Sequence, residues 1–548
     1  MSAVADFVSL KRGWAFVWLG IVALLLYLPG FFTLPPIDQD EAHFAEASRQ
    51  MIETGNFVDI RFQDEPRYQK PIGIYWLQSA AATIADQPPD AIWPYRLPSL
   101  CGAIVALCFV IRLGERLFDR RVGLVGACLL AFSTLLGVEA RLATTDACLL
   151  ACVMANLDAL AACYLGQADR RLAIQFWVAA GLGILLKGPI LPLIDFLIIA
   201  ALSITDRRLA WLKDLQPLLG LPILAALVAP WLVTIGLASH GAFYRSSLGN
   251  DFLAKLLHAQ EQHGAPPGFY IAAIAVTFWP GGLLAAAALP AVWLHRRQPA
   301  FKFLLAWLLP TWLLMELVPT KLPHYVLPLY PALALLAAAA FCDRTRPIAL
   351  GWPRWLVWAG VVLWLAVGIG LPAAAGIGAL LWTGSPNFTA IGAALAIGLA
   401  LMAALYLLRR DQRPAALGAI GAAAFIGQMA ILGLVLPRQD ELWLSRQAQQ
   451  LIHATTPCVD PTIASAGYGE PSLVFLLGRR TQIAGPEQAA DFLLDRKGKS
   501  CALALIDAQG TGAFHARLGA SKPLALGQIA GFDYTGGDRY ELTLYALP

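Results

Sequence analysis

The sequence predicts a polytopic α-helical membrane protein with about 13 transmembrane helices and a small C-terminal α/β domain. Hydrophobic residues make up 58% of the 548 residues, and charged residues only 14%. Soluble domains average about 25% charged residues. The mean hydropathy is +0.62, and apolar runs of about 20 residues, enough to cross a bilayer as a helix, recur along the chain. The net charge of +4 is too small to suggest a nucleic-acid partner.

The predicted spans begin after a charged N-terminus that lacks a small-residue cleavage site before Pro29. We therefore read the first span as a retained anchor rather than a removed signal peptide. Some segments, notably the third, fifth and tenth, are short and need protein neighbours or a cavity beside them. The segments are Trp14–Leu34, Pro94–Leu113, Val122–Val138, Cys148–Leu165, Leu172–Leu186, Ile190–Ile204, Pro217–Leu237, Phe269–Leu294, Phe301–Val318, Val326–Phe341, Trp355–Leu381, Thr389–Leu408 and Ala415–Leu436.

Basic residues alternate between the loops and so predict an orientation. Lys and Arg gather in one set of alternate loops, for example at 112–121, 207–213 and 409–413, whereas the other set is richer in Asp, Glu, His, Tyr and Gly. Cytoplasmic loops carry the excess of Lys and Arg. The alternation favours thirteen spans over twelve or fourteen, with the N-terminus in the cytoplasm and the C-terminal tail on the far side.

The polar segments on the far side suggest a domain division. We expect a transmembrane domain over 1–436, with external loops at 35–93 and 238–268, and a far-side α/β domain over 437–548. In the first loop, one helix is expected over Glu41–Glu53, stopped by Gly55, and Pro71 opens a second helix.

The tail alternates strand-like runs (TIASA, CALALI, YELTLYAL) with helical ones (PSLVFLLG, PEQAADFLL). This alternation is typical of a small α/β domain. Its Cys458 and Cys501 could form a disulfide on an oxidising side of the membrane. The alternative is a pair of buried free thiols.

Asp40 and Glu41 are the first candidate catalytic residues. They follow the outer end of the first span, where a carboxylate is costly unless it is solvated or paired. The alternative is helix capping, because Asp38 and Asp40 both precede the expected helix. A helix cap needs one acidic side chain, whereas this stretch contains three, Asp38, Asp40 and Glu41, so capping alone does not account for all of them.

Lys70 stands directly before Pro71, at the expected start of a helix. The lysine charge and the free N–H groups of the helix would make an anion site suited to phosphate, with Arg67 assisting. The alternative is a lysine that snorkels to the membrane interface.

Other far-side loops add polar groups to the same membrane face. The stretch EARLATTDA contains Asp146, a third catalytic candidate, and its alternative reading is a Glu139–Arg141 pair with a helix cap. Basic residues that only snorkel to the membrane interface would be found at both membrane faces. The clustering of charged groups at one face therefore supports a single site. The further substrate-binding candidates are Lys187, Lys321, Tyr325, Tyr330, Arg245 and Lys255.

The external loop at 238–268 contains a weak metal signal. Glu261 and His263 form E-x-H, and His258 lies nearby. Two ligands two residues apart on a helix do not share a face, so a Zn or Mg/Mn ion would need ligands from elsewhere. The sequence contains no GxGxxG or P-loop motif and therefore offers no recognisable nucleotide site.

The first loop, DQDEAHFAEASRQMIETGNFVDIRFQDEPRYQKPIGIYWLQ, resembles that of the polyprenyl-phosphate-sugar-dependent membrane glycosyltransferases of the GT-C fold and protein O-mannosyltransferase superfamily. WPYRLPS, EARLATTDA, LLKGPI, EQHGAPPGFY and PTKLPHYVLPLYP are similar to later landmarks of these proteins, in the same order. The resemblance implies a sugar donor on a polyprenyl phosphate, with Asp40 as the essential first-loop acid and Lys70 holding the carrier phosphate. His43 and Gln69 depart from the aminoarabinose subfamily, which tends to have Arg and Glu there.

The predicted span count and the C-terminal α/β domain most resemble the 4-amino-4-deoxy-L-arabinose lipid A transferases. The resemblance then implies that the protein transfers 4-amino-4-deoxy-L-arabinose from undecaprenyl phosphate to a phosphate of lipid A. It also implies a monomer in the bacterial inner membrane, with the active site and the C-terminal domain in the periplasm. This change would confer resistance to cationic antimicrobial peptides such as polymyxin. The alternatives are a related transferase with another sugar or a protein or glycan acceptor, and a transporter or flippase. Transport is disfavoured because the charges gather at one face and no repeat is visible.

Overall fold

The computed structural model describes residues 12–37, 39–247, 249, 264–345, 351–383, 386–456, 461–497 and 501–548. These residues form two compact units. The helical unit comprises Met1–Phe31, Tyr68–Ile74 and Arg96–Val435, and the α/β unit comprises Phe32–Arg67, Tyr75–Tyr95 and Leu436–Pro548. The first external loop therefore belongs mainly to the same compact unit as the C-terminal tail.

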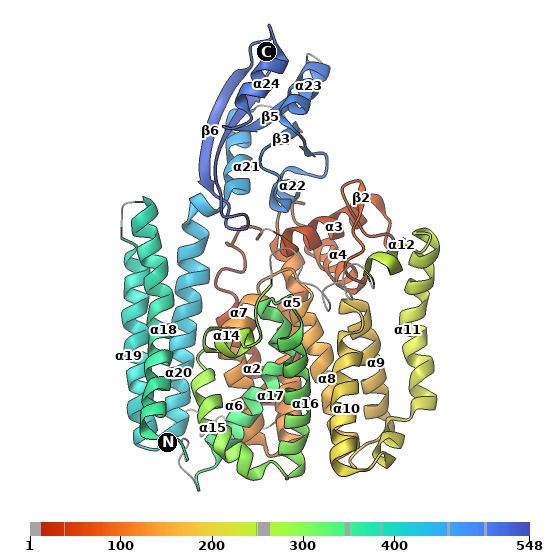
Figure 1. Cartoon of the computed structure of the whole chain (residues 1–548), viewed down its shortest axis with the longest axis vertical. Helices are drawn as coiled ribbons and strands as arrows, with labels where there is room; N and C mark the ends of the chain where they lie inside the picture. Colours follow the sequence, from red (N-terminus) through yellow and green to blue (C-terminus); the bar gives the residue numbers. More distant parts are fainter. Residues whose placement is uncertain are drawn as a thin grey trace. The chain divides into compact units, whose positions relative to one another are not determined.

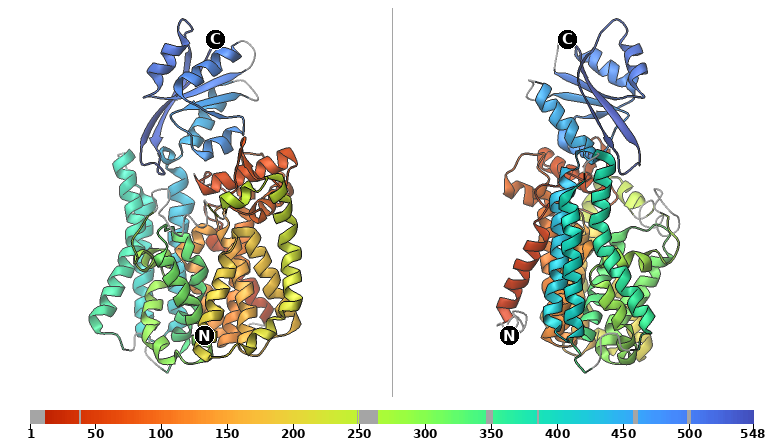
Figure 2. Two further views of the ribbon diagram at one scale, coloured as in Figure 1. Left: turned by 45° about the vertical axis from the view of Figure 1, so that its right-hand side comes forward. Right: turned by 90° about the vertical axis from the view of Figure 1, so that its left-hand side faces the viewer.

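The helical unit is a bundle of helices (Figures 1 and 2). Its elements are α2 (Arg12–Tyr27), α5 (Trp93–Leu117), α6 (Arg120–Phe132), α7 (Thr134–Glu139), α8 (Asp146–Tyr164), α9 (Arg170–Lys187), α10 (Ile190–Asp206), η1 (Ala210–Leu215), α11 (Pro217–Ala238), α12 (Ala242–Tyr244), α14 (Phe269–Thr277), α15 (Gly282–His295), α16 (Pro299–Leu317), η3 (Pro323–Leu329), α17 (Tyr330–Cys342), α18 (Arg354–Thr383), α19 (Phe388–Arg409), α20 (Arg413–Gln428) and η4 (Met429–Val435). The next element, η5 (Leu436–Arg438), opens the tail and belongs to the α/β unit.

Among the described residues, eight helices are long and apolar enough to cross a membrane, and two shorter apolar helices begin at Gly13 and Gly282. The predicted class, a multi-pass helical membrane protein, is confirmed. The count of thirteen spans remains a prediction. The expected single span Phe269–Leu294 is two helices, α14 and α15, interrupted at 278–281, where Pro280 has no N–H to continue a helix.

Small residues and one buried arginine hold helices of the bundle together. At the α5–α6 contact, a Cβ on Gly114 would stand 2.3 Å from the Cα of Gly123, so these backbones approach as only glycine permits. Arg141, 1% exposed, donates to the carbonyls of Leu26 and Gly137 and, at 2.7 Å, to that of Pro29. It thereby fixes the loop that leads into α8.

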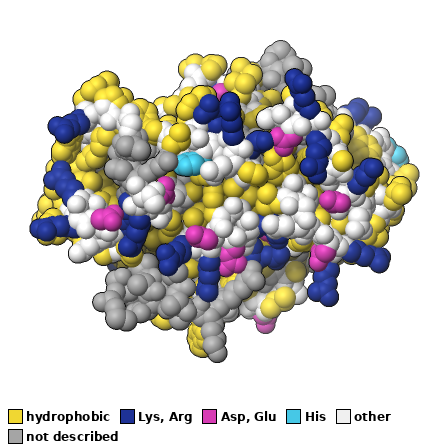
Figure 3. All heavy atoms as spheres, turned by 90° about the horizontal axis from the view of Figure 1, so that it is seen from below, with side chains coloured by type: hydrophobic (Ala, Val, Ile, Leu, Met, Phe, Trp, Pro, Cys, Tyr) yellow, Lys and Arg dark blue, Asp and Glu magenta, His cyan; other side chains and the backbone are white. Residues whose placement is uncertain are grey.

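Lys and Arg side chains are spread over the end of the molecule seen from below, with fewer acidic side chains among them (Figure 3). The loops with the predicted excess of basic residues contain exposed arginines, including Arg121, Arg171, Arg207 and Arg410. This distribution is the pattern on which the predicted orientation rests. The orientation itself remains a prediction.

The α/β unit contains a five-stranded sheet in the order β4-β3-β5-β7-β6. β3 (Thr462–Ala466) pairs in parallel with β4 (Gln482–Ile483) and β5 (Ala502–Asp507), and β7 (Arg539–Ala546) is antiparallel to β5 and to β6 (Leu524–Phe532). The strands expected in TIASA, CALALI and YELTLYAL are confirmed.

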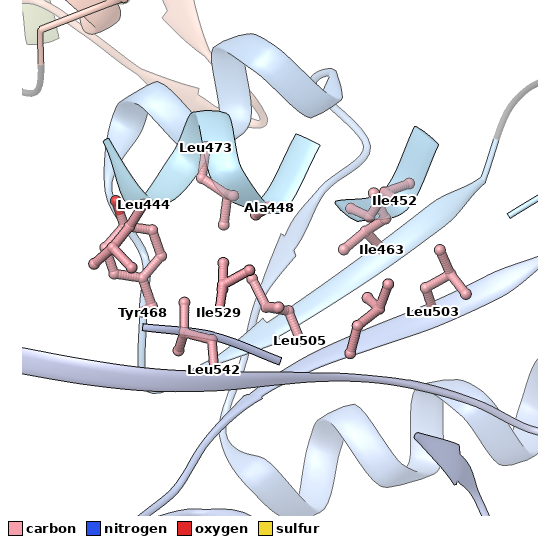
Figure 4. Packing of buried hydrophobic residues seen from close by; sticks show 11 residues of the cluster. Leu444, Ala448, Ile452, Ile463, Tyr468, Leu473, Leu503, Leu505, Ile529 and Leu542 are labelled. Atoms are coloured by element: carbon pink, nitrogen blue, oxygen red, sulfur yellow. The ribbon is translucent and has the colours of Figure 1, made fainter. Parts of the chain in front are cut away.

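Helices supply hydrophobic cores for this sheet. α21 (Leu444–Thr455) and α22 (Pro471–Leu477) pack through Leu444, Ala448, Ile452 and Leu473 onto Leu503, Leu505 and Leu542 (Figure 4). A second cluster joins α23 (Pro486–Arg496) and α24 (Thr511–Leu518) to the alternate residues of β3 and β5. Because side chains alternate across a strand, the two clusters lie on opposite faces of the sheet.

Cys501 is disulfide-bonded, whereas Cys458 lies outside the described residues. The seven cysteines at 101, 108, 128, 148, 152, 163 and 342 are free.

The first external loop adds α3 (Asp40–Thr54), the short strands β1 (Arg61–Phe62) and β2 (Glu65–Pro66), and α4 (Gly73–Ala85), which crosses into the helical unit. η6 (Asp440–Leu442) precedes α21. The expected helix over Glu41–Glu53 is confirmed. It ends at Gly55, whose φ of 68° is the left-handed conformation that glycine adopts without strain.

Within the α/β unit, α3 packs against α22. Arg49 is 4% exposed, donates to the carbonyl of Phe475 at 2.6 Å and lies 5.3 Å from the centre of its ring. Glu53 forms an ion pair with Arg479 at 3.3 Å. The C-terminal domain therefore holds the helix that begins at Asp40.

Replacing Arg49 by Gln is expected to lower the free energy of unfolding by about 2 kcal/mol, since it removes a buried charge-assisted hydrogen bond. The matched control is Arg517→Gln, in the same unit, whose side chain is 55% exposed and pairs with Asp491. That change should cost less than about 1 kcal/mol. Thermal unfolding of the detergent-solubilised chain measures both, and equal losses would contradict the role given to Arg49.

Glu46 makes the stability of this interface depend on pH. Burial raises the pKa of its carboxyl to about 7, although the charge of Arg49 opposes the shift. The folded chain then binds more protons than the unfolded chain, whose carboxyl has a pKa of about 4.3. Stability should therefore be highest at acid pH and fall between about pH 4.5 and pH 7. Melting curves of wild type and Glu46→Gln across this range test the sign, since the variant should lose this part of the slope.

Candidate active site

A cavity of about 100 Å³ lies within the helical unit, and segments far apart in the sequence line it. Its polar residues are Gln69, Lys70, Asp146, Lys187, Ser247, His324 and Tyr325. They come from the segment before α4, the start of α8, the end of α9, the region after α12, and η3. The structure therefore brings together four of the predicted site residues, Lys70, Asp146, Lys187 and Tyr325.

An ion pair organises the polar side of the cavity. Lys187 Nζ lies 2.6 Å from Asp146 Oδ1, and the two side chains are 12% and 7% exposed. The same Nζ lies 5.5 Å from the centre of the Tyr325 ring. Lys187 ends α9 where Gly188, at φ 66°, turns the chain toward α10, so the backbone places the ammonium group at the cavity wall.

His324 and Glu139 extend this polar cluster. His324 Nδ1 lies 4.0 Å from Glu139 Oε1, and Glu139 Oε2 accepts a hydrogen bond of 2.8 Å from the Thr144 hydroxyl. In the alternative reading of EARLATTDA, Glu139 pairs with Arg141 and a cap starts α8. The cap is wrong, because the side chain of Thr145 makes no capping hydrogen bond. Arg141 donates to backbone carbonyls and to the Gln428 side chain, and its pairing with Glu139 remains a prediction.

The remaining wall of the cavity is apolar. Leu149, Ile190, Leu193, Met315 and Val318 line it. A cavity lined by both lysine and aliphatic side chains suits an amphiphile with an anionic head, because a phosphate is stabilised by cations and a hydrocarbon chain by apolar burial.

Asp40 lies in the α/β unit, as the first residue of α3. Its side chain is 57% exposed and lies 3.8 Å from Arg67 Nη2. The N-cap residue is Gln39, whose side chain makes no capping hydrogen bond, and Asp38 lies outside the described residues. The capping alternative for Asp40 is therefore wrong. Glu41 is 1% exposed and accepts a hydrogen bond of 2.9 Å from the Ile37 N–H, so its carboxylate is turned back onto the preceding loop.

Arg67 is 8% exposed and lies 5.5 Å from the centre of the Phe44 ring. Burial and the Arg67 charge lower the pKa of the nearby His43 to about 4. His43 is therefore neutral at pH 7, and Arg67 is the cation beside Asp40. In the sequence Arg67 precedes Lys70 by three residues, so the loop that holds Asp40 leads directly to the cavity segment.

Other predicted site residues do not line the cavity. Lys321 is 4% exposed and donates to the Val318 carbonyl at 2.5 Å, and Tyr330 bonds to Thr277 at 2.5 Å. Arg245 is exposed just beyond α12. Lys255, His258, Glu261 and His263 lie outside the described residues. Within the part of the chain that the structure describes, no group of three or more His, Cys, Asp or Glu could hold a metal ion.

Gln69 and Ser247 line the cavity but were not expected at the site, whereas His324 was expected at the same membrane face as Lys321, Tyr325 and Tyr330. His324 precedes Tyr325 in PTKLPHYVLPLY, and Gln69 precedes Lys70, so both stood in motifs already singled out. Ser247 carries no comparable sequence signal.

Comparison with known sequences supports the family resemblance. Residues 69–233 match the family model of dolichyl-phosphate-mannose-protein mannosyltransferase. The undecaprenyl phosphate-alpha-4-amino-4-deoxy-L-arabinose arabinosyl transferase of Pseudomonas paraeruginosa is 29% identical over 341 residues, 59% of this chain and 60% of that protein. The Aeromonas salmonicida protein of the same name is 28% identical over 337 residues, with the same coverage. The chain thus spans about 60% of the length of these curated relatives.

Solved structures extend the likeness to the whole fold. ArnT from Cupriavidus metallidurans bound to undecaprenyl phosphate matches with a TM-score of 0.76 at 17% identity, over 97% of this chain and 98% of that chain. The oligosaccharyltransferase of Archaeoglobus fulgidus matches with a TM-score of 0.55 at 13% identity, over 91% and 70%. The resemblance is thereby confirmed, and the chain has the fold of the integral-membrane glycosyltransferases of the ArnT type.

Proposed function

We propose that the protein transfers 4-amino-4-deoxy-L-arabinose from undecaprenyl phosphate to a phosphate of lipid A, on the periplasmic side of the bacterial inner membrane. The observation that carries the proposal is the cavity that Lys70 and Lys187 line together with several aliphatic side chains. Such a cavity fits a polyprenyl phosphate, and relatives of this chain are named for that donor. The added amino sugar would reduce the negative charge that attracts polymyxin and other cationic peptides.

The two lysines would act on the leaving group. As the bond between the sugar and the carrier phosphate breaks, negative charge grows on the phosphate oxygens, and fixed cations stabilise that charge. Asp146 holds Lys187 at 2.6 Å and so orients its ammonium group. The aliphatic side chains would hold the first part of the prenyl chain by excluding water.

The acceptor decides the role proposed for Asp40. A lipid A phosphate is already ionised at neutral pH and needs no base to take a proton. Asp40 would then orient the sugar by pairing with its 4-ammonium group. Its exposed side chain, with Arg67 at 3.8 Å, leaves carboxylate oxygen available for that contact.

A second candidate is transfer of another sugar to a protein or glycan hydroxyl. The match of residues 69–233 to a protein mannosyltransferase family favours it. A hydroxyl must lose its proton during attack, and Asp40 would be the base. The donor cavity would serve both reactions unchanged.

Reconstitution of the purified chain distinguishes the two. Vesicles containing undecaprenyl-phosphate-linked aminoarabinose are offered either lipid A or a Ser/Thr-containing peptide, and the products are weighed by mass spectrometry. Pentosylated lipid A is the expected product. Modified peptide with unmodified lipid A would favour a protein acceptor, and intact donor in both arms would contradict transfer of aminoarabinose.

A further inference from the structure

A second cavity of the helical unit lies far from Lys70 and Lys187 in the sequence and shares no residue with the donor cavity. It has a volume of about 410 Å³ and lies between the first turns of α15, the first turns of α18 and the end of α19. Its wall is mainly apolar and includes Leu284, Ala287, Val361 and Leu405, while Arg409, Asp411 and Arg413 stand at one end. We call it the Arg409 groove.

The two arginines at the end of the groove differ in their hydrogen-bond and ion-pair partners. Arg413 is fully engaged, since it bonds to Asp411 at 2.8 Å and donates to the carbonyls of Phe341 and Asp343 at 2.8 and 2.7 Å. Arg409 has no carboxylate within ion-pair distance among the described residues, and its guanidinium lies 5.4 Å from the centre of the Trp358 ring. Within the described part of the chain, the groove therefore ends in one cation that has no ion-pair partner.

The place of the groove in the bundle indicates what fills it. α18 and α19 are both long and apolar enough to span a membrane, so a groove between them opens to lipid rather than to water. Its cationic end belongs to the loops with the excess of Lys and Arg, at the end of the bundle seen in Figure 3. Head groups of acidic lipids collect beside such basic loops, and basic pockets between spanning helices bind them.

We propose that the Arg409 groove is a binding site for an acidic phospholipid. An acyl chain lies along Leu284, Ala287, Val361 and Leu405, and the head-group phosphate accepts hydrogen bonds from the Arg409 guanidinium. Trp358 keeps that guanidinium at the groove through its ring face. A zwitterionic phospholipid carries no net charge and gains less from the same cation.

Arg410 provides a matched control. It is the next residue after the end of α19, is likewise exposed, and lies 5.4 Å from the centre of the Tyr406 ring, but it does not line the groove. Both arginines interact favourably with the negative C-terminal end of the helix dipole. A role confined to the dipole or to general surface charge would therefore make the two equivalent.

Native mass spectrometry of the full-length protein, titrated with phosphatidylglycerol or phosphatidylethanolamine in detergent, tests the proposal. Wild type should bind one phosphatidylglycerol in preference to phosphatidylethanolamine. Arg409→Ala should weaken that binding about five-fold, the effect of about 1 kcal/mol per basic residue, whereas Arg410→Ala should change it less than two-fold. Ala287→Trp fills the groove without changing its charge and should abolish binding of the lipid.

Two results would overturn the proposal. Equal binding of the two phospholipids would mean that only general membrane lipid surrounds the helices. Equal losses in Arg409→Ala and Arg410→Ala would assign the effect to surface charge. Because neither residue touches the donor cavity, the test stands whether or not the proposed sugar transfer is correct.

Discussion

Replacing Asp40 by Asn is expected to reduce sugar transfer by at least about 10²-fold, the effect of losing one preorganised electrostatic group. Protein stability should change by less than about 1 kcal/mol, because the side chain is 57% exposed, caps no helix and forms only a 3.8 Å ion pair. Initial rates in the reconstituted assay and melting temperatures measure the two effects separately.

Asp59→Asn is the matched control, since Asp59 lies in the same unit and pairs with an arginine, Arg61, at 2.8 Å. It should retain wild-type transfer. If Asp40→Asn were as active as Asp59→Asn, Asp40 would not belong to the reaction.

The second large effect concerns the buried pair in the donor cavity. Lys187→Met alone leaves the Asp146 carboxylate buried without its cation, which should cost about 3–5 kcal/mol of stability. The double variant Lys187→Met, Asp146→Leu removes both charges and should recover most of that stability. Transfer should remain lost in both, because the cation proposed for the carrier phosphate is absent.

The double variant therefore separates structure from function. Size-exclusion chromatography and thermal melting report the folded fraction, and the reconstituted assay reports transfer. Recovery of both stability and activity would show that the pair only stabilises the helices. Lys302→Met with Asp206→Leu, a more exposed ion pair at 2.5 Å in the same unit, is the control that should keep activity.

The helices and strands could be predicted from local sequence patterns, because each of these patterns spans only a few residues. The first-loop helix was expected over Glu41–Glu53 and spans Asp40–Thr54, since Gly55 ends it in a conformation that other residues adopt only at a cost. The strands at Thr462, Ala502 and Arg539 followed from their β-branched and alternating sequences. β6 was not predicted, because Gly527 and Gly531 weaken its strand signal.

Pairings over long sequence separations could not be predicted in detail. The sequence indicated that charged loops gather at one membrane face. It did not indicate that Lys187 would form an ion pair with Asp146, 41 residues away. Lys321 and Tyr330 share a motif with Tyr325, yet the 3₁₀ turn η3 presents only part of that motif to the cavity. The packing of α3 on α22 joins residues more than 400 positions apart, and no local pattern encodes it.

The most direct test of the central claim is mass spectrometry of lipid A from cells that make the aminoarabinose donor but lack their own transferase. Expression of this chain should add the mass of the amino sugar to lipid A, and the Asp40→Asn variant should not. Unchanged lipid A, with the chain present in the membrane and the donor detected in the same cells, would contradict the proposed acceptor.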